Sequence, residues 1–317
     1  MSNALPVVPI QTAPAIIHTP REQWLSRRRE GVGASEVAAI LGFDGTRDAL
    51  SVYAEKIGVL EVEETALMRW GKRVEDAIAW GYSEETDRSV YNPGEFEIAK
   101  HPDLPILGAT LDRETEGSVL APAPAKGRGA LEIKAVNAFM ADEWKEEPPL
   151  KHQIQNQMQI ACKGQAWGSL AALIGGLRIA WQDILRNDVF IEHALREVEI
   201  FWRCVQRREP PMVKEAKAAT WEAIKALYPS DNGLGIVLPV EAIDIVKTWR
   251  EYSAVRLEAS KREDDAKVQL QQLMGEATAG LLVDGSSITF KTSSRDGYTV
   301  APTTYRTLRH LKPKGSK

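Results

Sequence analysis

The run Leu131-Glu132-Ile133-Lys134 alternates apolar and charged residues, which predicts a half-buried strand. On such a strand Glu132 and Lys134 point to the same face, because side chains alternate with a period of two. With another acid nearby, a carboxylate and an ammonium on one face could hold a divalent metal beside a base or charge clamp. A single Glu-x-Lys sequence is more often a surface salt bridge than a metal site. The neighbouring residues therefore decide between these two interpretations.

A second acid, Asp112, ends the apolar run at 104–111. This run predicts a strand, closed by Asp112, that pairs with the strand carrying Glu132, and the Gly- and Pro-bearing stretch at 117–129 would connect them. Together with Lys134, the two acids form the pattern D-(x)n-E-x-K. This pattern is the signature of PD-(D/E)XK nucleases.

The composition is ordinary for a globular protein, with 317 residues of which 44% are hydrophobic and 26% charged. The formal net charge of -4 excludes a uniformly basic nucleic-acid coat but permits DNA binding through a local basic lining. Cys162 and Cys204 lie far apart, which argues against an iron–sulfur cluster and for a reducing compartment. No apolar run spans a bilayer and no signal peptide is visible, so we expect a cytoplasmic location and no membrane partner.

The rest of the sequence predicts three parts: an N-terminal arm, a region of both helices and strands, and a C-terminal extension. Residues 1–20, rich in Pro, Ala and Thr, predict a loose arm. Apolar spacing then predicts helices at 21–29, 67–82, 151–162 and 188–208 and further strands at 90–98 and 167–177, up to Pro210-Pro211. The extension is expected to hold a short helix at 216–228, a helical arm or hairpin at 240–276, a strand pair at 281–291 and a basic tail from Arg306.

Ser35 follows Gly31 and Gly33 and precedes an apolar helical run, which predicts that it caps the start of a helix. A helix N-terminus with free amides, a hydroxyl and nearby arginines could bind an anion such as phosphate. Arg28 and Arg29 are the nearest arginines of the preceding basic triplet. The alternative is a plain cap beside solvated arginines.

Two further features lie on predicted helices. Glu75 follows Val74 on an apolar stripe, so it could lie at the edge of the buried face or be a solvated carboxylate. The helix at 151–162 carries several glutamines, whose amides can hydrogen-bond a phosphate or an active-site carboxylate. A solvated glutamine-rich face is the alternative.

Taken in order, these segments resemble the YqaJ-type viral recombinase family of PD-(D/E)XK nucleases, whose best-known relative is the phage lambda exonuclease. The matching segments are 29–36, 70–75, 109–112, 131–134 and 153–158, followed by Phe201-Trp202 and Pro210-Pro211. They cover about residues 21–211, and so many motifs in one order are hard to obtain by chance. The sequence departs from the family at Leu111, where proline is usual, and at Arg113, where glycine often follows the acid.

The resemblance implies an α/β (α+β) fold, with a restriction-endonuclease-like core at 21–211 whose central mixed sheet is flanked by helices. A helical extension would occupy 212–317, after the arm at 1–20. The implied activity is that of a Mg²⁺-dependent deoxyribonuclease, an exonuclease that degrades linear double-stranded DNA from the 5′ end. The 3′ single-stranded overhangs would serve phage-type recombination, with DNA ends, a single-strand annealing protein and a homo-oligomeric ring as implied partners.

Phosphodiester hydrolysis needs an in-line water and a neutralised, stabilised leaving oxygen, which a two-metal site supplies. From chemistry and resemblance together, Asp112, Glu132 and the backbone carbonyl of Ile133 would hold Mg²⁺, for which Mn²⁺ could substitute. Glu75 would hold metal-bound water or a second ion. Lys134 would orient or deprotonate the attacking water, and its pKa should fall beside two cations because like charge disfavours the ammonium.

The resemblance also implies contacts to the substrate. Gln153 would brace Lys134 or a phosphate. Arg29 and Ser35 would receive the 5′ phosphate, with Arg28 as the next candidate.

Two other functions stay open. A structure-specific or restriction-type endonuclease uses the same acids, and a non-catalytic DNA-binding scaffold could keep the same fold. The intact set of acids and lysine argues against a scaffold, because a decayed nuclease usually loses one of them.

Overall fold

The computed structural model describes residues 19–311 except 62, 95, 118–126, 214 and 298–304. The predicted arm lies outside the described residues as far as residue 18, as does the basic tail from Lys312 and most of the expected loop at 117–129. The chain divides into two compact units, residues 1–228 and 229–317, and each is described by itself.

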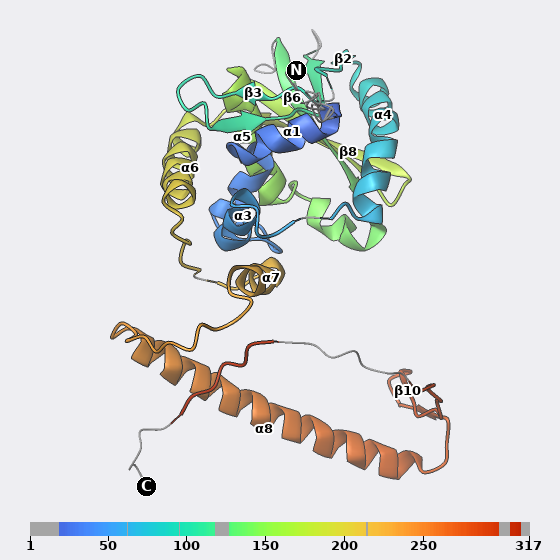
Figure 1. Cartoon of the computed structure of the whole chain (residues 1–317). Coiled ribbons are helices and arrows are strands. Elements are labelled where there is room, and N and C mark those ends of the chain that lie inside the picture. The colour runs from blue at the N-terminus through green and yellow to red at the C-terminus, as the bar shows by residue number, and fades with distance from the viewer. Residues whose placement is uncertain are drawn as a thin grey trace, which may run out of the picture. The chain divides into compact units, whose positions relative to one another are not determined.

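The first unit contains both helices and strands (Figure 1). The helices are α1 (Pro20–Arg29), η1 (Ala34–Glu36), α2 (Val37–Ile40), α3 (Ala49–Lys56), α4 (Ala66–Thr86), η2 (Ala138–Trp144), α5 (Leu150–Lys163), α6 (Asp188–Arg207) and α7 (Ala218–Leu227). The strands are β1 (Val32–Gly33), β2 (Val90–Tyr91), β3 (Ala99–Lys100), β4 (Leu107–Ala109), β5 (Arg113–Glu116), β6 (Arg128–Val136), β7 (Trp167–Ile174) and β8 (Arg178–Leu185).

The core of this unit is a five-stranded mixed sheet with the order β2-β5-β6-β7-β8. Strand β6, which carries the E-x-K sequence, pairs antiparallel with β5 and parallel with β7, so it lies at the centre of the sheet. Helices pack on this sheet, which confirms the predicted α+β fold with a central mixed sheet.

Helices α4 and α5 cover the two faces of β6. Ile78 of α4 packs in one cluster with Leu131 and Ile133. Because side chains alternate along a strand, Glu132 points to the other face, towards α5. Glu132 is only 1% exposed, so the prediction of a half-buried strand was wrong: β6 is covered on both sides here.

A second, three-stranded sheet has the order β1-β4-β3. The apolar run at 104–111 enters this small sheet through β4, whereas β5, beginning at Arg113, pairs with β6. Asp112 therefore lies where the chain passes from one sheet to the other, and the prediction that its own strand pairs with β6 was wrong. Among the described residues of the predicted strand at 90–98, only Val90 and Tyr91 form a strand, β2 of the central sheet, and β3 of the small sheet begins after this range at Ala99.

The helix after Pro211, α7, packs on α3 and belongs to the first unit. Its Ala223 is fully buried in the main apolar cluster, and the Thr220 hydroxyl donates to the Asp48 carboxylate at the start of α3. The division between the units therefore follows Tyr228 and not Pro211.

The second unit holds α8 (Ala242–Met274) and an antiparallel pair, β9 (Ala279–Leu281) and β10 (Ser287–Thr289). Helix α8 is one continuous helix without buried residues, so the described chain forms the expected arm and not a hairpin. At the strand connection, Gly285 has φ +85°, a conformation that favours glycine. Within the described ranges, no helix has the length and apolarity needed to cross a membrane.

Candidate active site

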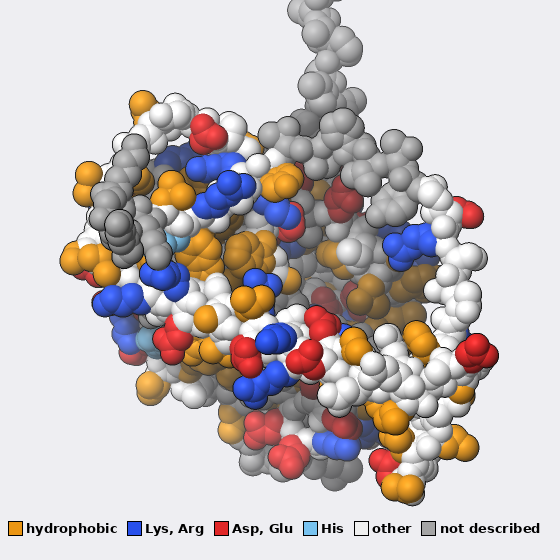
Figure 2. All heavy atoms as spheres, turned by 90° about the horizontal axis from the view of Figure 1, so that it is seen from below, with side chains coloured by type: hydrophobic (Ala, Val, Ile, Leu, Met, Phe, Trp, Pro, Cys, Tyr) orange, Lys and Arg blue, Asp and Glu red, His pale blue; other side chains and the backbone are white. Residues whose placement is uncertain are grey.

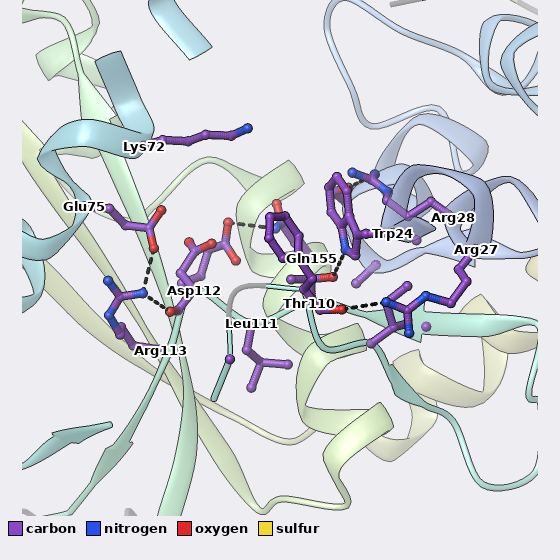
Figure 3. A pocket seen from close by; sticks show the side chains of 18 of the residues that line it. Trp24, Arg27, Arg28, Lys72, Glu75, Thr110, Leu111, Asp112, Arg113 and Gln155 are labelled. Carbon is purple, nitrogen blue, oxygen red and sulfur yellow. Dashed lines mark hydrogen bonds and ion pairs between the residues drawn. The ribbon is translucent and has the colours of Figure 1, made fainter. Parts of the chain in front are cut away.

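The two acids of the D-(x)n-E-x-K pattern meet at the start of β5 and the middle of β6. They line an open pocket of about 510 Å³, together with Glu75 and Lys134 (Figure 3). The Ile133 backbone N–H donates to Asp112 Oδ2 at 2.8 Å, which holds Asp112 against the strand that carries Glu132. The structure thus brings four predicted site residues from three elements of the chain into one pocket.

The buried Glu132 carboxylate is hydrogen-bonded through both oxygens. Oε1 accepts from Gln155 Nε2 at 2.7 Å and from Lys134 Nζ. Oε2 accepts from Gln159 Nε2. Residues four apart share one face of a helix, so α5 presents both amides to this carboxylate. A buried carboxylate with this many donors is fixed in place.

Gln153, the glutamine predicted for the site, lies elsewhere. Its Nε2 donates to the Pro148 carbonyl oxygen at 2.7 Å, and it does not line the pocket. Positions two apart on a helix do not face the same way, so Gln153 cannot share the face of Gln155. Gln153 and Gln157 have the same helical spacing as Gln155 and Gln159, so the spacing alone does not distinguish the two pairs.

At the acidic end of the pocket, burial and neighbouring charges shift the pKa values of the titrating side chains. Burial raises the pKa of Asp112 to about 8, and the negative charges of Glu132 and Glu75 add to this effect. Burial opposes the charged form of Lys134, but the surrounding carboxylates, with Glu132 foremost, hold its pKa above the ordinary value. Repulsion among the acids is therefore not fully balanced by Lys134, and a cation would relieve it.

Arg113, which departs from the family pattern, organises another acid. Its Nη1 donates to Glu75 Oε1 at 2.8 Å and also to the Asp112 carbonyl oxygen, while Nη2 pairs with Asp76. Burial raises the pKa of Glu75, and the Arg113 charge opposes that rise. Arg113 therefore ties α4 to the start of β5 and places Glu75 beside the other acids (Figure 3).

The donors at this end fit a hard cation in type and number. Carboxylate and carbonyl oxygens suit Mg²⁺ and Mn²⁺, and Mg²⁺ needs only one or two carboxylates beside water and substrate phosphate. Asp112 and Glu132 supply two such carboxylates. Among the described residues, no three His, Cys, Asp or Glu side chains form a group that could hold a metal ion. Glu75 accepts a hydrogen bond from Arg113.

The opposite end of the pocket is basic. Arg21, Arg27 and Arg28 of α1 line it, together with Lys100 of β3. Figure 3 shows Arg27 and Arg28 across the pocket from Glu75 and Asp112, whereas Lys72 lies on the same side as Glu75. Figure 2 shows another face of the molecule, on which basic and acidic side chains are interspersed.

Arg28 is the predicted arginine that lies with Ser35. Arg28 Nη2 donates to Ser35 Oγ at 3.3 Å, and its guanidinium lies 4.8 Å from the centre of the Trp24 ring. Trp24 is fixed in turn, because its Nε1 donates to Thr110 Oγ1 at 3.1 Å. Arg29 instead pairs with Glu61 at 3.6 Å and does not line the pocket.

Ser35 does not cap a helix, so that prediction was wrong. It lies inside the 3-10 turn η1, and the helix that follows, α2, has only four residues. The candidate anion site is therefore not the N-terminus of a long helix. It consists of the Ser35 hydroxyl beside the Arg28 guanidinium.

The turn with Ser35 reaches the pocket because Gly31 allows a close backbone approach. A Cβ atom on Gly31 would lie 2.3 Å from the Ile106 carbonyl oxygen, which accepts a hydrogen bond from the Val32 N–H at 2.7 Å. This contact lets β1 pair with β4, the strand that leads to Asp112. Gly31 is thus required for the connection between the two ends of the pocket.

A family model matches the part of the chain that carries this site. Residues 23–166, which contain the acids, Lys134, Arg28 and Ser35, match the model of the YqaJ-like viral recombinase domain. The predicted resemblance to this family is therefore confirmed for residues 23–166. A relative in Bacillus subtilis (strain 168), the uncharacterized protein YqaJ, is 26% identical over 275 residues, covering 83% of this chain and 81% of that protein.

Solved structures give partial likenesses. The alkaline exonuclease LHK-Exo from Laribacter hongkongensis is 24% identical with a TM-score of 0.49, covering 59% of this chain and 94% of that one. A phage-related exonuclease from Haemophilus somnus 129PT is 12% identical with a TM-score of 0.42, covering 56% of this chain and 94% of that one.

Proposed function

We propose that the chain is a metal-dependent DNA exonuclease that acts at the ends of linear double-stranded DNA. The observation that carries this proposal is one pocket with fixed carboxylates at one end and Arg28 with Ser35 at the other. An acidic end suits metal-assisted phosphodiester hydrolysis, and a basic end suits a substrate phosphate. The YqaJ-like domain and the names of the similar exonucleases agree with this function.

The proposed chemistry assigns one task to each group at the acidic end. Asp112, Glu132 and the Ile133 carbonyl would hold Mg²⁺ or Mn²⁺, which supplies charge neutralisation at the scissile phosphate when bound. Lys134 would orient the attacking water and move its proton. Glu75 would hold a further water, or a second ion if it leaves Arg113.

At the basic end, Arg28 and Ser35 would receive a terminal 5′ phosphate. A terminal phosphate carries more charge than an internal phosphodiester, and a guanidinium binds it through charge-assisted hydrogen bonds. Binding of that group would set a 5′-to-3′ direction and leave 3′ single strands, the substrate of an annealing protein in recombination. A homo-oligomeric ring around DNA remains part of the same proposal.

The experiment is digestion of end-labelled linear duplex DNA with Mg²⁺, comparing 5′-phosphate with 5′-hydroxyl ends and including a closed circular duplex. We expect loss of the 5′ label from linear DNA, faster with the phosphate, and an intact circle. Chelation of the metal should stop digestion. Nicking of the circle would indicate an endonuclease, and no cleavage of any substrate would indicate a binding protein.

A further inference from the structure

A buried ion pair lies behind the basic end of the pocket. Lys56, the last residue of α3, and Glu36 of η1 have side chains that are only 3% and 5% exposed. Lys56 Nζ lies 2.7 Å from Glu36 Oε2, and neither residue lines the pocket. Buried charges are costly unless they are paired and hydrogen-bonded. The contacts of this ion pair therefore indicate which parts of the backbone it holds in position.

Both partners contact backbone that carries the basic end. Lys56 Nζ donates to the Arg28 carbonyl oxygen at 2.7 Å, in the last turn of α1, where carbonyls lack partners within the helix. Glu36 Oε2 accepts from the Gly33 backbone N–H at 2.6 Å. The pair therefore joins the end of α1 to the turn that leads to Ser35.

Glu36 also faces the guanidinium of Arg28. Arg28 Nη2 lies 3.8 Å from Glu36 Oε1, a looser contact than the 2.7 Å between Glu36 and Lys56. Burial opposes ionisation of Glu36, but the charges of Lys56 and Arg28 hold its pKa below the ordinary value. Lys56 occupies the nearer position at this carboxylate, and Arg28 Nη2 donates to Ser35 Oγ instead.

We propose that Lys56 is a positioning residue for recognition of the DNA end, an inference that rests on the function proposed above. By neutralising Glu36 from inside the fold, Lys56 prevents this carboxylate from capturing Arg28. The guanidinium then remains available for a terminal phosphate at Ser35. Without Lys56, Arg28 is the one remaining cation that pairs with Glu36 among the described residues, and Arg28 turns away from the pocket.

The test compares wild type, Lys56→Met and the double variant Glu36→Gln/Lys56→Met. The readout is the ratio of kcat/KM on 5′-phosphorylated to that on 5′-hydroxyl linear duplex DNA. Lys56→Met should lower this ratio by about tenfold or more, the loss expected for one hydrogen bond to a charged group. Its rate on hydroxyl ends should stay near that of wild type. Lys145→Met, which changes a lysine that is 68% exposed, is the matched control.

The double variant separates positioning from general support. Because the Glu36→Gln side chain carries no charge, it does not capture Arg28, and the ratio should return towards that of wild type. Fluorescence anisotropy with the two duplexes in the absence of divalent ions gives the same comparison without catalysis. Thermal unfolding followed by circular dichroism establishes that each variant is folded.

An unchanged ratio in Lys56→Met overturns the role of Lys56. A ratio that stays low in the double variant also overturns it, because the pair is then only a structural support. If Lys56→Met does not fold, the double variant alone decides. A wild type that cleaves no DNA overturns the proposed function instead, and the anisotropy ratio still tests Lys56.

Discussion

Arg113 Nη1 lies 2.8 Å from Glu75 Oε1, which links the residue after Asp112 to a helix on one face of the central sheet. The Arg113 side chain is 12% exposed, so the link is largely shielded from water. Glu75 therefore has a defined position although its helix covers the face opposite to Glu132.

The first prediction concerns this link. Arg113→Met should lower kcat for DNA cleavage by about ten- to a hundredfold, the usual range for a group that orients a metal-site residue, with little change in KM. Steady-state kinetics checks it, with Arg128→Met as a control because Arg128 lies in β6 and does not line the pocket. Equal kinetics for Arg113→Met and wild type would show that Glu75 needs no such support.

The second prediction concerns the acids. Asp112→Asn should abolish Mg²⁺-dependent cleavage because it removes the charge that would hold the metal, while the amide oxygen can still accept from Ile133. DNA binding and the unfolding temperature should stay close to those of wild type. The matched control is Asp142→Asn, which changes a side chain that is 82% exposed and does not line the pocket. Substantial turnover by Asp112→Asn would remove Asp112 from the site.

The third prediction concerns the lysine. Lys134→Ala should slow cleavage by about two to four orders of magnitude, the range for a positioned acid–base group, and should barely change DNA affinity. Single-turnover kinetics and a binding titration measure the two effects separately. A loss confined to affinity would make Lys134 a phosphate contact.

The fourth prediction separates two neighbouring arginines. Arg28→Ala should remove most of the preference for 5′-phosphorylated over 5′-hydroxyl ends, because Arg28 lies with Ser35 in the pocket. Arg29→Ala should keep the preference, because Arg29 pairs with Glu61 outside the pocket. The opposite pattern in a cleavage assay with both substrates would return the phosphate contact to Arg29.

The fifth prediction concerns stability and pH. Burial, helped by the charges of Lys134 and Lys151, lowers the pKa of His152 to about 3, against an ordinary value near 6.5. Between these values the unfolded chain binds a proton that the folded protein does not, so stability falls as the pH falls through this window. His152→Gln should reduce that slope by up to about 1.4 kcal/mol per pH unit in denaturant titrations between pH 6 and pH 4. Identical slopes for the two proteins would contradict the low pKa.

Local periodicity predicted the E-x-K strand well. Glu132 and Lys134 share a face because a strand repeats every two residues, and that rule does not depend on the rest of the fold. The order of the motifs also indicated Asp112, which lines the same pocket as Glu132 and Lys134. In contrast, the pairing of β4 and β5 with different sheets depends on hydrogen bonds to strands far away in the sequence, which no local pattern contains.

The individual side chains that reach a site were harder to predict. Successive residues of a helix point about 100° apart, so tertiary packing selects Arg28 over Arg29. Trp24 shows this selection, since its ring packs against Arg28 from the previous turn of α1. Gln153 failed as a prediction for the same geometric reason, because its face of α5 is not the one that meets Glu132.

The pairing of β1 with β4 has a consequence for the product of digestion. Gly33 is in register with Gly108, so the chain reaches Ser35 two residues after this pair and Asp112 four residues after it. The backbone hydrogen bonds between these strands therefore fix the spacing between the proposed phosphate contact and the proposed site of hydrolysis. This spacing does not depend on the identity of the bases in the DNA. Each round of cleavage would therefore release a fragment of constant length from any sequence.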